Sequence, residues 1–120
     1  MYDHIGLRTP DLASSAAFYK ACLATLGYQL VYEDEATAGF GPPDAPALWL
    51  HAAPAGASSS MHLALRAQTR DAVDKFHAAG LAAGGRDNGA SGIRADYSAT
   101  YYAAFLLDPD GNNIEAVCLT

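Results

Sequence analysis

Basic side chains are scarce in this chain of 120 residues, and their scarcity excludes several kinds of partner. Seven lysines and arginines stand against thirteen acidic residues, which gives a formal net charge of −6 at pH 7. The seven are scattered, so they form no basic stripe of the kind that binds nucleic acid or an anionic membrane surface. We therefore expect neither nucleic acid nor a membrane among the partners of this protein.

Cysteines and long apolar runs are also rare. Cys22 and Cys118 form neither a disulfide framework nor a metal-binding spacing, so we expect two reduced thiols in a cytoplasmic protein. No apolar run approaches the roughly 18 residues of a membrane-spanning helix. The first residues lack the basic start and apolar stretch of a signal peptide. The remaining composition, 51% hydrophobic and 17% charged, indicates one globular domain over residues 1–120.

The first half of the chain predicts a strand, a helix and three further strands. After a strand at residues 2–8, Thr9 is a candidate helix cap, Pro10 suits the first helical position and Asp11 suits the positive end of the helix dipole. Gly27 is a natural helix stop. The apolar stripe of this helix consists of Leu12, Ala16, Tyr19, Leu23 and Leu26. The segments that follow are expected to be strands at 28–33, 38–40 and 47–52, and then a flexible boundary at 54–60.

The second half predicts the same order of elements. A strand at residues 61–66 leads to a helix that Thr69 caps and that we expect to end near residue 79, before Gly80. The remaining segments are expected as follows: a short strand within 81–86, a long loop at 87–100, a strand at 101–107, a tight turn at 108–111 and a last strand at 114–119.

A short internal repeat supports this parallel. Residues 4–8 read HIGLR and residues 62–66 read HLALR, 58 positions later, and each copy precedes a threonine and a helix. We therefore predict an α+β fold made of two βαβββ modules, module one at about 1–56 and module two at about 60–120. A looser match between the ends of the two halves makes His51, or a neighbour, the residue of the first half that is equivalent to Glu115 in the second half.

The repeat also gathers candidate metal ligands. His4 and His62 occupy equivalent positions, and Glu115 lies in the last predicted strand among apolar residues, where an unpaired charge is costly. Two imidazoles and one carboxylate form the facial triad that suits a divalent transition metal with open positions. Taken singly, each histidine is also compatible with a structural hydrogen bond, and the glutamate with a solvated strand edge.

Two stretches resemble the vicinal oxygen chelate superfamily, which includes glyoxalase I, fosfomycin- and bleomycin-resistance proteins and extradiol dioxygenases. The first combines HIGL at residues 4–7, the following Thr-Pro-Asp, Phe18-Tyr19 and LGY at 26–28, and the second is FLLDPDGNNIE at 105–115. The resemblance covers almost the whole chain. It implies an incomplete mixed β-barrel of paired βαβββ modules around a metal.

The resemblance also implies a site. It identifies His4, His62 and Glu115 as ligands of a divalent ion (zinc, nickel, manganese or iron), with Glu115 as the catalytic residue. It implies a homodimer in which each site takes its first histidine from one chain and the other two ligands from its partner. Glyoxalase I needs a fourth ligand, a glutamate, on the strand before the second module. That strand offers His51 and no glutamate.

Three residues of the second half are candidates for binding a substrate. Arg94, Tyr97 and Tyr101 lie in or beside the predicted loop, which would form a lid or a pocket wall. The alternative is a solvated loop with Tyr101 packed in the core. Trp49 is expected in the core or on the cavity wall.

The resemblance leaves three functions open. The first is a metal-dependent enzyme of the lyase or isomerase, thiol transferase or dioxygenase type, acting on a small oxygen-bearing molecule. The second is a metal-free protein that binds a drug or another small molecule, as bleomycin-resistance proteins do, which the net charge of −6 would suit. The third is a sensor or structural dimer with a vestigial metal site.

Overall fold

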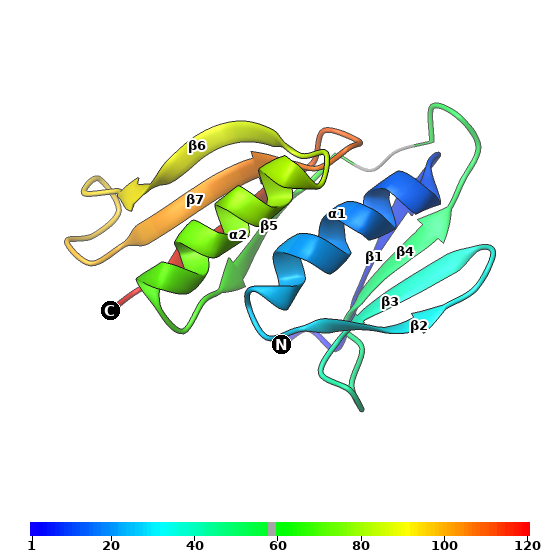
Figure 1. The fold of residues 1–120 in the computed structure, drawn as a ribbon, viewed down its shortest axis with the longest axis horizontal. Coiled ribbons are helices and arrows are strands. Elements are labelled where there is room, and N and C mark those ends of the chain that lie inside the picture. The colour runs from blue at the N-terminus through cyan, green and yellow to red at the C-terminus, as the bar shows by residue number, and fades with distance from the viewer. Residues whose placement is uncertain (58–59) are drawn as a thin grey trace.

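The chain forms two βαβββ modules that stand side by side, as the repeat predicts (Figure 1). The computed structural model describes residues 1–57 and 60–120, so part of the predicted boundary at 54–60 lies outside the described residues. Module one comprises β1 (Ile5–Thr9), α1 (Leu12–Ala24), β2 (Gln29–Glu33), β3 (Thr37–Gly41) and β4 (Leu48–Ala52). Module two comprises β5 (His62–Arg66), α2 (Arg70–Ala82), β6 (Arg86–Ile93), β7 (Tyr102–Leu107) and β8 (Asn113–Cys118).

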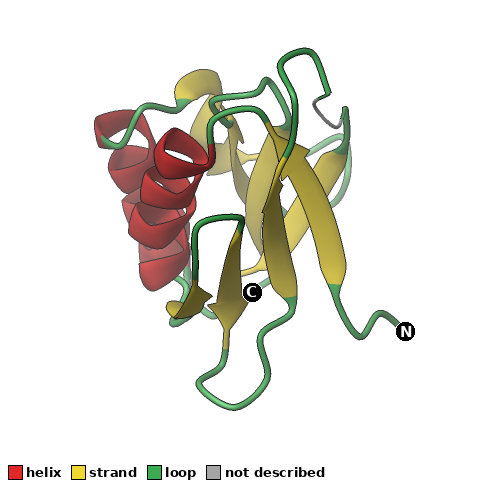
Figure 2. Ribbon diagram, turned by 90° about the vertical axis from the view of Figure 1, so that its right-hand side faces the viewer, coloured by secondary structure: helices red, strands yellow, loops and turns green. Residues whose placement is uncertain are grey.

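Each module contains a four-stranded mixed sheet of the same topology. The strand orders are β1-β4-β3-β2 and β5-β8-β7-β6. In both, the first strand pairs in parallel with the last, and the other pairs are antiparallel. Within the described residues the two sheets share no strand and do not close into a barrel. Figure 2 shows both helices on one side of the sheets, so each sheet keeps a second face that no helix covers.

The core lies between the helices and the sheets. Tyr19 of the predicted apolar stripe is fully buried, and Phe18, which the stripe does not include, is buried as well. Their rings meet edge to face, with centroids 5.0 Å apart. Phe76 of α2 and Leu106 of β7 are buried in the same core cluster and are contributed by module two. No helix within the described ranges is long and apolar enough to cross a bilayer.

The turn between β7 and β8 is tied into this core by a buried carboxylate. The Tyr19 hydroxyl donates to Asp108 Oδ2 at 2.6 Å, and the side-chain amide of Asn112 donates to the same oxygen at 2.8 Å. Asp108 Oδ1 accepts the backbone N–H groups of Asp110 and Asn112 at 2.9 and 2.8 Å. The turn is thereby held against α1, and the start of β8 is held with it.

Two helix boundaries differ from the prediction. Asp11, not Thr9, caps α1, and its side chain accepts the N–H of Ser14 at 3.1 Å. Thr9 is the last residue of β1, where it is buried and hydrogen-bonded to the hydroxyl of Ser15 at 2.9 Å. The second cap is confirmed, since Thr69 accepts the N–H of Ala72 at 3.1 Å. However, α2 does not end before Gly80.

Helix α2 continues to Ala82, because Gly80 serves close packing rather than termination. A Cβ at this position would collide with the side chain of Leu106 and would lie 3.2 Å from the Phe18 ring. The short strand expected within 81–86 is therefore displaced, because residues 81 and 82 are helical and β6 begins only at Arg86.

The predicted long loop at 87–100 is also wrong, because residues up to Ile93 form β6, which pairs with β7. Its pairing register shifts on either side of Gly89. Because of these irregularities and the many small residues, the segment lacks the apolar–polar alternation from which a strand is predicted. Only the segment from Arg94 to Tyr101 remains as a connection between strands.

Candidate functional site

Parallel pairing of β5 with β8 places the two strongest ligand candidates of module two together. His62 pairs in register with Asn113, and Ala64 with Glu115. Because side chains alternate along a strand, His62 and Glu115 both lie on the uncovered face of this sheet. The distance from His62 Nε2 to Glu115 Oε2 is 3.1 Å.

Glu115 is an unusually buried carboxylate for a face that no helix covers. Its side chain is 3% exposed, whereas that of His62 is 50% exposed. The hydroxyl of Tyr101 donates to Glu115 Oε1 at 2.6 Å. This hydrogen bond is the main reason why the pKa of Tyr101 rises to about 12, so the phenol is neutral at physiological pH. The buried carboxyl group of Glu115 is thus contacted by one phenol and one imidazole.

The second ring nitrogen of His62 is also engaged. His62 Nδ1 lies 3.2 Å from the carbonyl oxygen of Asn113, which can only accept, so Nδ1 carries a proton. In neutral histidine this leaves a lone pair on Nε2, directed at Glu115. Two acceptors that face each other at 3.1 Å need a proton or a cation between them. The ring itself stacks on Phe105, with centroids 6.4 Å apart.

This donor set fits a divalent metal ion. A nitrogen and an oxygen that each bind a metal at about 2.1 Å, roughly at a right angle, lie about 3.0 Å apart. A histidine whose other nitrogen donates to a backbone carbonyl is the usual form of a metal-bound imidazole. The burial of Glu115 removes competing water from one side.

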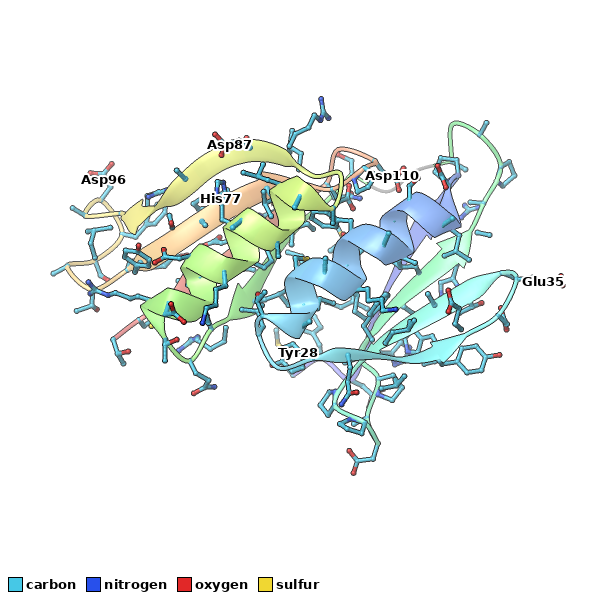
Figure 3. The ribbon with its side chains drawn as sticks, in the orientation of Figure 1. Tyr28, Glu35, His77, Asp87, Asp96 and Asp110 are labelled. Atoms are coloured by element: carbon cyan, nitrogen blue, oxygen red, sulfur yellow. The ribbon has the colours of Figure 1, made fainter. Side chains whose placement is uncertain are left out.

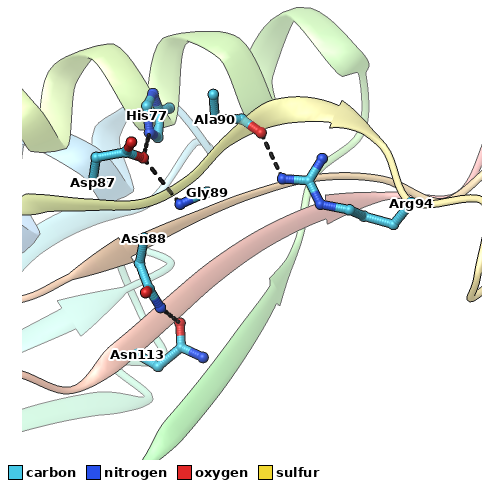
Figure 4. A network of polar contacts seen from close by, with 7 residues as sticks. All are labelled: His77, Asp87, Asn88, Gly89, Ala90, Arg94 and Asn113. Carbon is cyan, nitrogen blue, oxygen red and sulfur yellow. Dashed lines mark hydrogen bonds and ion pairs between the residues drawn. The ribbon is translucent and has the colours of Figure 1, made fainter.

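A second histidine–carboxylate pair, on the outside of module two, lacks these features. His77 of α2 and Asp87 of β6 lie next to each other in Figure 3, and His77 Nε2 is 2.9 Å from Asp87 Oδ1 (Figure 4). The Asp87 side chain is 60% exposed. A hydrogen bond from the N–H of Gly89, followed by that from His77, lowers the pKa of Asp87. In this pair the carboxylate is exposed and the imidazole is mostly covered, the reverse of the His62–Glu115 pair, so it provides a comparison.

His4 is not brought to the His62–Glu115 pair within one chain. It precedes β1, its side chain is 61% exposed, and its Nδ1 lies 2.6 Å from Asp3 Oδ1. It stands at the rim of an apolar pocket of about 150 Å³ between the modules, which Leu48 and Leu63 help to line. Over residues 1–57 and 60–120, no three histidine, cysteine or acidic side chains are arranged to hold a metal ion.

The strand registers also show which residue of module one corresponds to Glu115. Gly6 and Ala64 are equivalent in the repeat, and they pair with Trp49 and Glu115 respectively. The counterpart of Glu115 is therefore Trp49, and His51 lies two residues further along, in register with Arg8. The looser match of the two ends misplaces this position by two residues.

Trp49 lies on the uncovered face of the first sheet, outside the core. Its indole rests on Gly39 of β3, where a Cβ would come within 2.6 Å of the ring. Its centroid is 5.8 Å from that of Tyr32.

The three predicted substrate residues occupy different settings. Tyr97 and Tyr101 line a shallow depression next to Glu115, and their rings meet edge to face at 4.9 Å. Asp96, at the tip of the same connection in Figure 3, borders this depression. The Arg94 guanidinium instead donates to the carbonyls of Ala90 and Gly92 at 2.6 and 3.1 Å, the first of which is drawn in Figure 4.

Two residues of this face were not singled out from the sequence. Phe105 packs between the His62 ring and the Arg94 guanidinium, whose central carbon lies 5.4 Å from the Phe105 centroid. Arg66 lies on the same face as His62, four residues further along β5, and its charge acts to lower the pKa of Tyr101. The available signal for Arg66 was its place as the final residue of the repeated pentapeptide.

The comparisons with known proteins agree on one family. The model of the Glyoxalase/Bleomycin resistance protein/Dioxygenase superfamily matches residues 2–116. The chain is 31% identical to a glyoxalase/bleomycin resistance protein from Albidiferax ferrireducens T118, with a TM-score of 0.83 and 98% of each chain covered. No curated protein sequence matches significantly.

More distant solved structures share the fold. A glyoxalase-related enzyme from Fulvimarina pelagi has a TM-score of 0.74 at 20% identity, over 98% of this chain and 86% of the other. A lactoylglutathione lyase from Agrobacterium tumefaciens has a TM-score of 0.69 at 19% identity, over 98% and 92%.

Proposed function

The chain belongs to the Glyoxalase/Bleomycin resistance protein/Dioxygenase superfamily, and on that premise we propose that it is a metal-dependent enzyme acting on a small oxygen-bearing molecule. His62 and Glu115 would hold the divalent ion. The observation that carries this proposal is the buried Glu115 carboxylate, 3.1 Å from an imidazole nitrogen whose ring is oriented by the Asn113 carbonyl.

We propose His4 of a second copy of the chain as the third ligand. His4 lies away from the pair in its own chain, and the uncovered sheet faces leave His62 half exposed. A twofold dimer that brings the first module of one chain to the second module of its partner would complete two identical sites. Three protein ligands leave positions open for two oxygens of a substrate.

A bound divalent ion would supply Lewis-acid stabilisation of negative charge developing on a substrate oxygen. The chain's own groups have separate tasks around it. Arg66 adds positive charge to the same face and favours an anionic or oxygen-rich substrate. Phe105 supplies an apolar wall beside His62, and Trp49 stands where a fourth, carboxylate ligand would otherwise be placed. The type of reaction, whether lyase or isomerase, thiol transfer or dioxygenation, follows from the metal that the protein selects.

The decisive experiment is the metal content of the purified protein, measured by elemental mass spectrometry. We expect close to one divalent ion per chain in the wild type and its loss in His62→Ala and Glu115→Ala. His77→Ala is the matched control, because it removes an imidazole from a histidine–carboxylate pair of similar distance but leaves the candidate site intact. An iron-loaded protein would favour dioxygenation, whereas zinc, nickel or manganese would favour isomerase, lyase or transferase chemistry.

Sharing of the site between two chains can be tested by mixing variants. His4→Ala and His62→Ala chains should each lose metal when pure. After dissociation and random reassociation, about a quarter of all sites should recover, because each mixed dimer has one site with every ligand present. No recovery would place the ligands within one chain. If the wild type binds no divalent ion even in excess, metal-free binding of a small molecule becomes the better proposal.

A further inference from the structure

The two oxygens of the Glu115 carboxylate have different partners. Oε2 faces the imidazole of His62 at 3.1 Å, on the more exposed side. Oε1 accepts the Tyr101 hydroxyl at 2.6 Å, on the side of the β6–β7 connection. A short hydrogen bond of this kind fixes the plane of a carboxylate and so decides which oxygen it presents.

Tyr101 is itself held in place. Its carbonyl accepts the N–H of Arg94 at 2.8 Å, and its N–H donates to the carbonyl of Ser98 at 3.3 Å. The ring of Tyr97 packs edge to face against it. The hydrogen bond between Arg94 and Tyr101 joins the two ends of the β6–β7 connection. This connection therefore holds the Tyr101 hydroxyl toward Glu115.

We propose that Tyr101 is a positioning residue that holds Glu115 so that Oε2 alone is presented to the metal ion and to His62. This inference rests on the proposed metal site and replaces the expectation that Tyr101 binds substrate. Tyr101 acts through the ligand: its hydroxyl is occupied by Oε1, and it touches neither the metal nor the reacting molecule. Outer partners of metal ligands typically contribute about ten- to a hundredfold to metal affinity.

The test compares Tyr101→Phe with Tyr97→Phe, in the full chain and without any substrate. Both variants remove one phenolic hydroxyl and keep the ring, so the edge-to-face contact at 4.9 Å is retained in each. The Tyr97 side chain is exposed, whereas the Tyr101 hydroxyl reaches the buried carboxylate. Affinity for Zn²⁺ is measured by competition with a chromophoric chelator, and the ligand field by the visible absorption spectrum of the Co²⁺-loaded proteins.

We expect Tyr101→Phe to weaken Zn²⁺ binding about tenfold or more while one site per chain is retained, and to change the intensity of the Co²⁺ bands as Glu115 reorients. Tyr97→Phe should stay within about twofold of the wild type. Wild-type affinity and an unchanged Co²⁺ spectrum in Tyr101→Phe would overturn the positioning role and return Tyr101 to the candidates for substrate binding. A wild type that binds neither ion would overturn the metal site and this role together, which separates the two failures. Far-ultraviolet circular dichroism of both variants checks that the fold is unchanged.

Discussion

In module two, the uncovered sheet face carries Glu115 where the same face of module one carries Trp49. The cross-strand neighbours differ as well, since Trp49 pairs with Gly39 of β3 and Glu115 pairs with Phe105 of β7. Each module thus has one large aromatic ring at this level of the sheet, but on different strands. The same topology presents a stacked indole in one half and an ionisable pair in the other, so topology fixes positions while the residues at those positions decide the chemistry.

The turns that lead into β4 and β8 differ in the same way. In module one, Asp44 follows two prolines in a link whose residues 42–45 are exposed. In module two, Asp108 is buried and accepts hydrogen bonds from Tyr19, Asp110 and Asn112. The strand that carries Glu115 is therefore the one whose preceding turn is anchored to the core.

The largest effect is expected from removing that anchor. Asp108→Ala leaves the buried Tyr19 hydroxyl and the Asn112 amide without their acceptor, at about 1–3 kcal/mol for each orphaned group, so a loss of roughly 3 kcal/mol or more is expected. Asp44→Ala, in the corresponding exposed turn, should change stability by less than about 0.5 kcal/mol. Urea unfolding of both variants measures the difference. Equal, small effects would show that the two turns are energetically alike.

A moderate effect is expected from the glycine beneath Trp49. Gly39→Ala introduces a Cβ within 2.6 Å of the indole and should displace the ring, at a cost of about 1–2 kcal/mol. Trp49 is the single tryptophan of the chain, so a red shift of its fluorescence reports the displacement directly. Gly6→Ala is the control, since its Cβ would meet the His51 ring at an ordinary 3.5 Å and the equivalent residue of β5 is Ala64. An unshifted emission in Gly39→Ala would refute the close stacking.

The smallest effect concerns the two thiols, one in each module, which form no disulfide and are both buried. Burial in α1 raises the pKa of Cys22 to about 12, whereas a hydrogen bond with the Thr120 hydroxyl is the main cause that lowers the pKa of Cys118. The thiolate is the reactive form, so Cys118, near the end of β8, should be alkylated at a lower pH than Cys22. Cys22 keeps its proton up to about pH 12 in the folded protein, whereas its pKa in the unfolded chain is near 9. The stability that the protonated thiol contributes is therefore lost as pH rises from about 9 to about 12.

Peptide mapping after timed exposure to iodoacetamide measures both rates, and the thiol reaction should leave the metal site unaffected. Faster reaction of Cys22 than of Cys118 would contradict the expected order. The variant Cys118→Ser gives the rate of Cys22 alone.

Local patterns were enough for most elements and for the pair His62 and Glu115. Alternation and helical spacing located both helices and every strand except β6, and the repeat and the family resemblance selected His62 and Glu115, which the structure places 3.1 Å apart. The failures have a common cause. Gly80 reads as a helix stop and residues 87–93 as a loop, because a glycine looks the same whether it ends an element or makes room for a neighbour such as Phe18 or Phe105.

By itself, then, the sequence determined the two βαβββ modules, the family and the candidate ligands, because these depend on periodicity and on short motifs. Tertiary structure alone decided that Tyr101 meets Glu115, that Trp49 and not His51 is the counterpart of that glutamate, and that His4 lies apart from both within one chain. Those facts depend on strand register and on contacts between distant segments. A shift of two residues between strands leaves every local pattern intact, yet it changes which side chains meet.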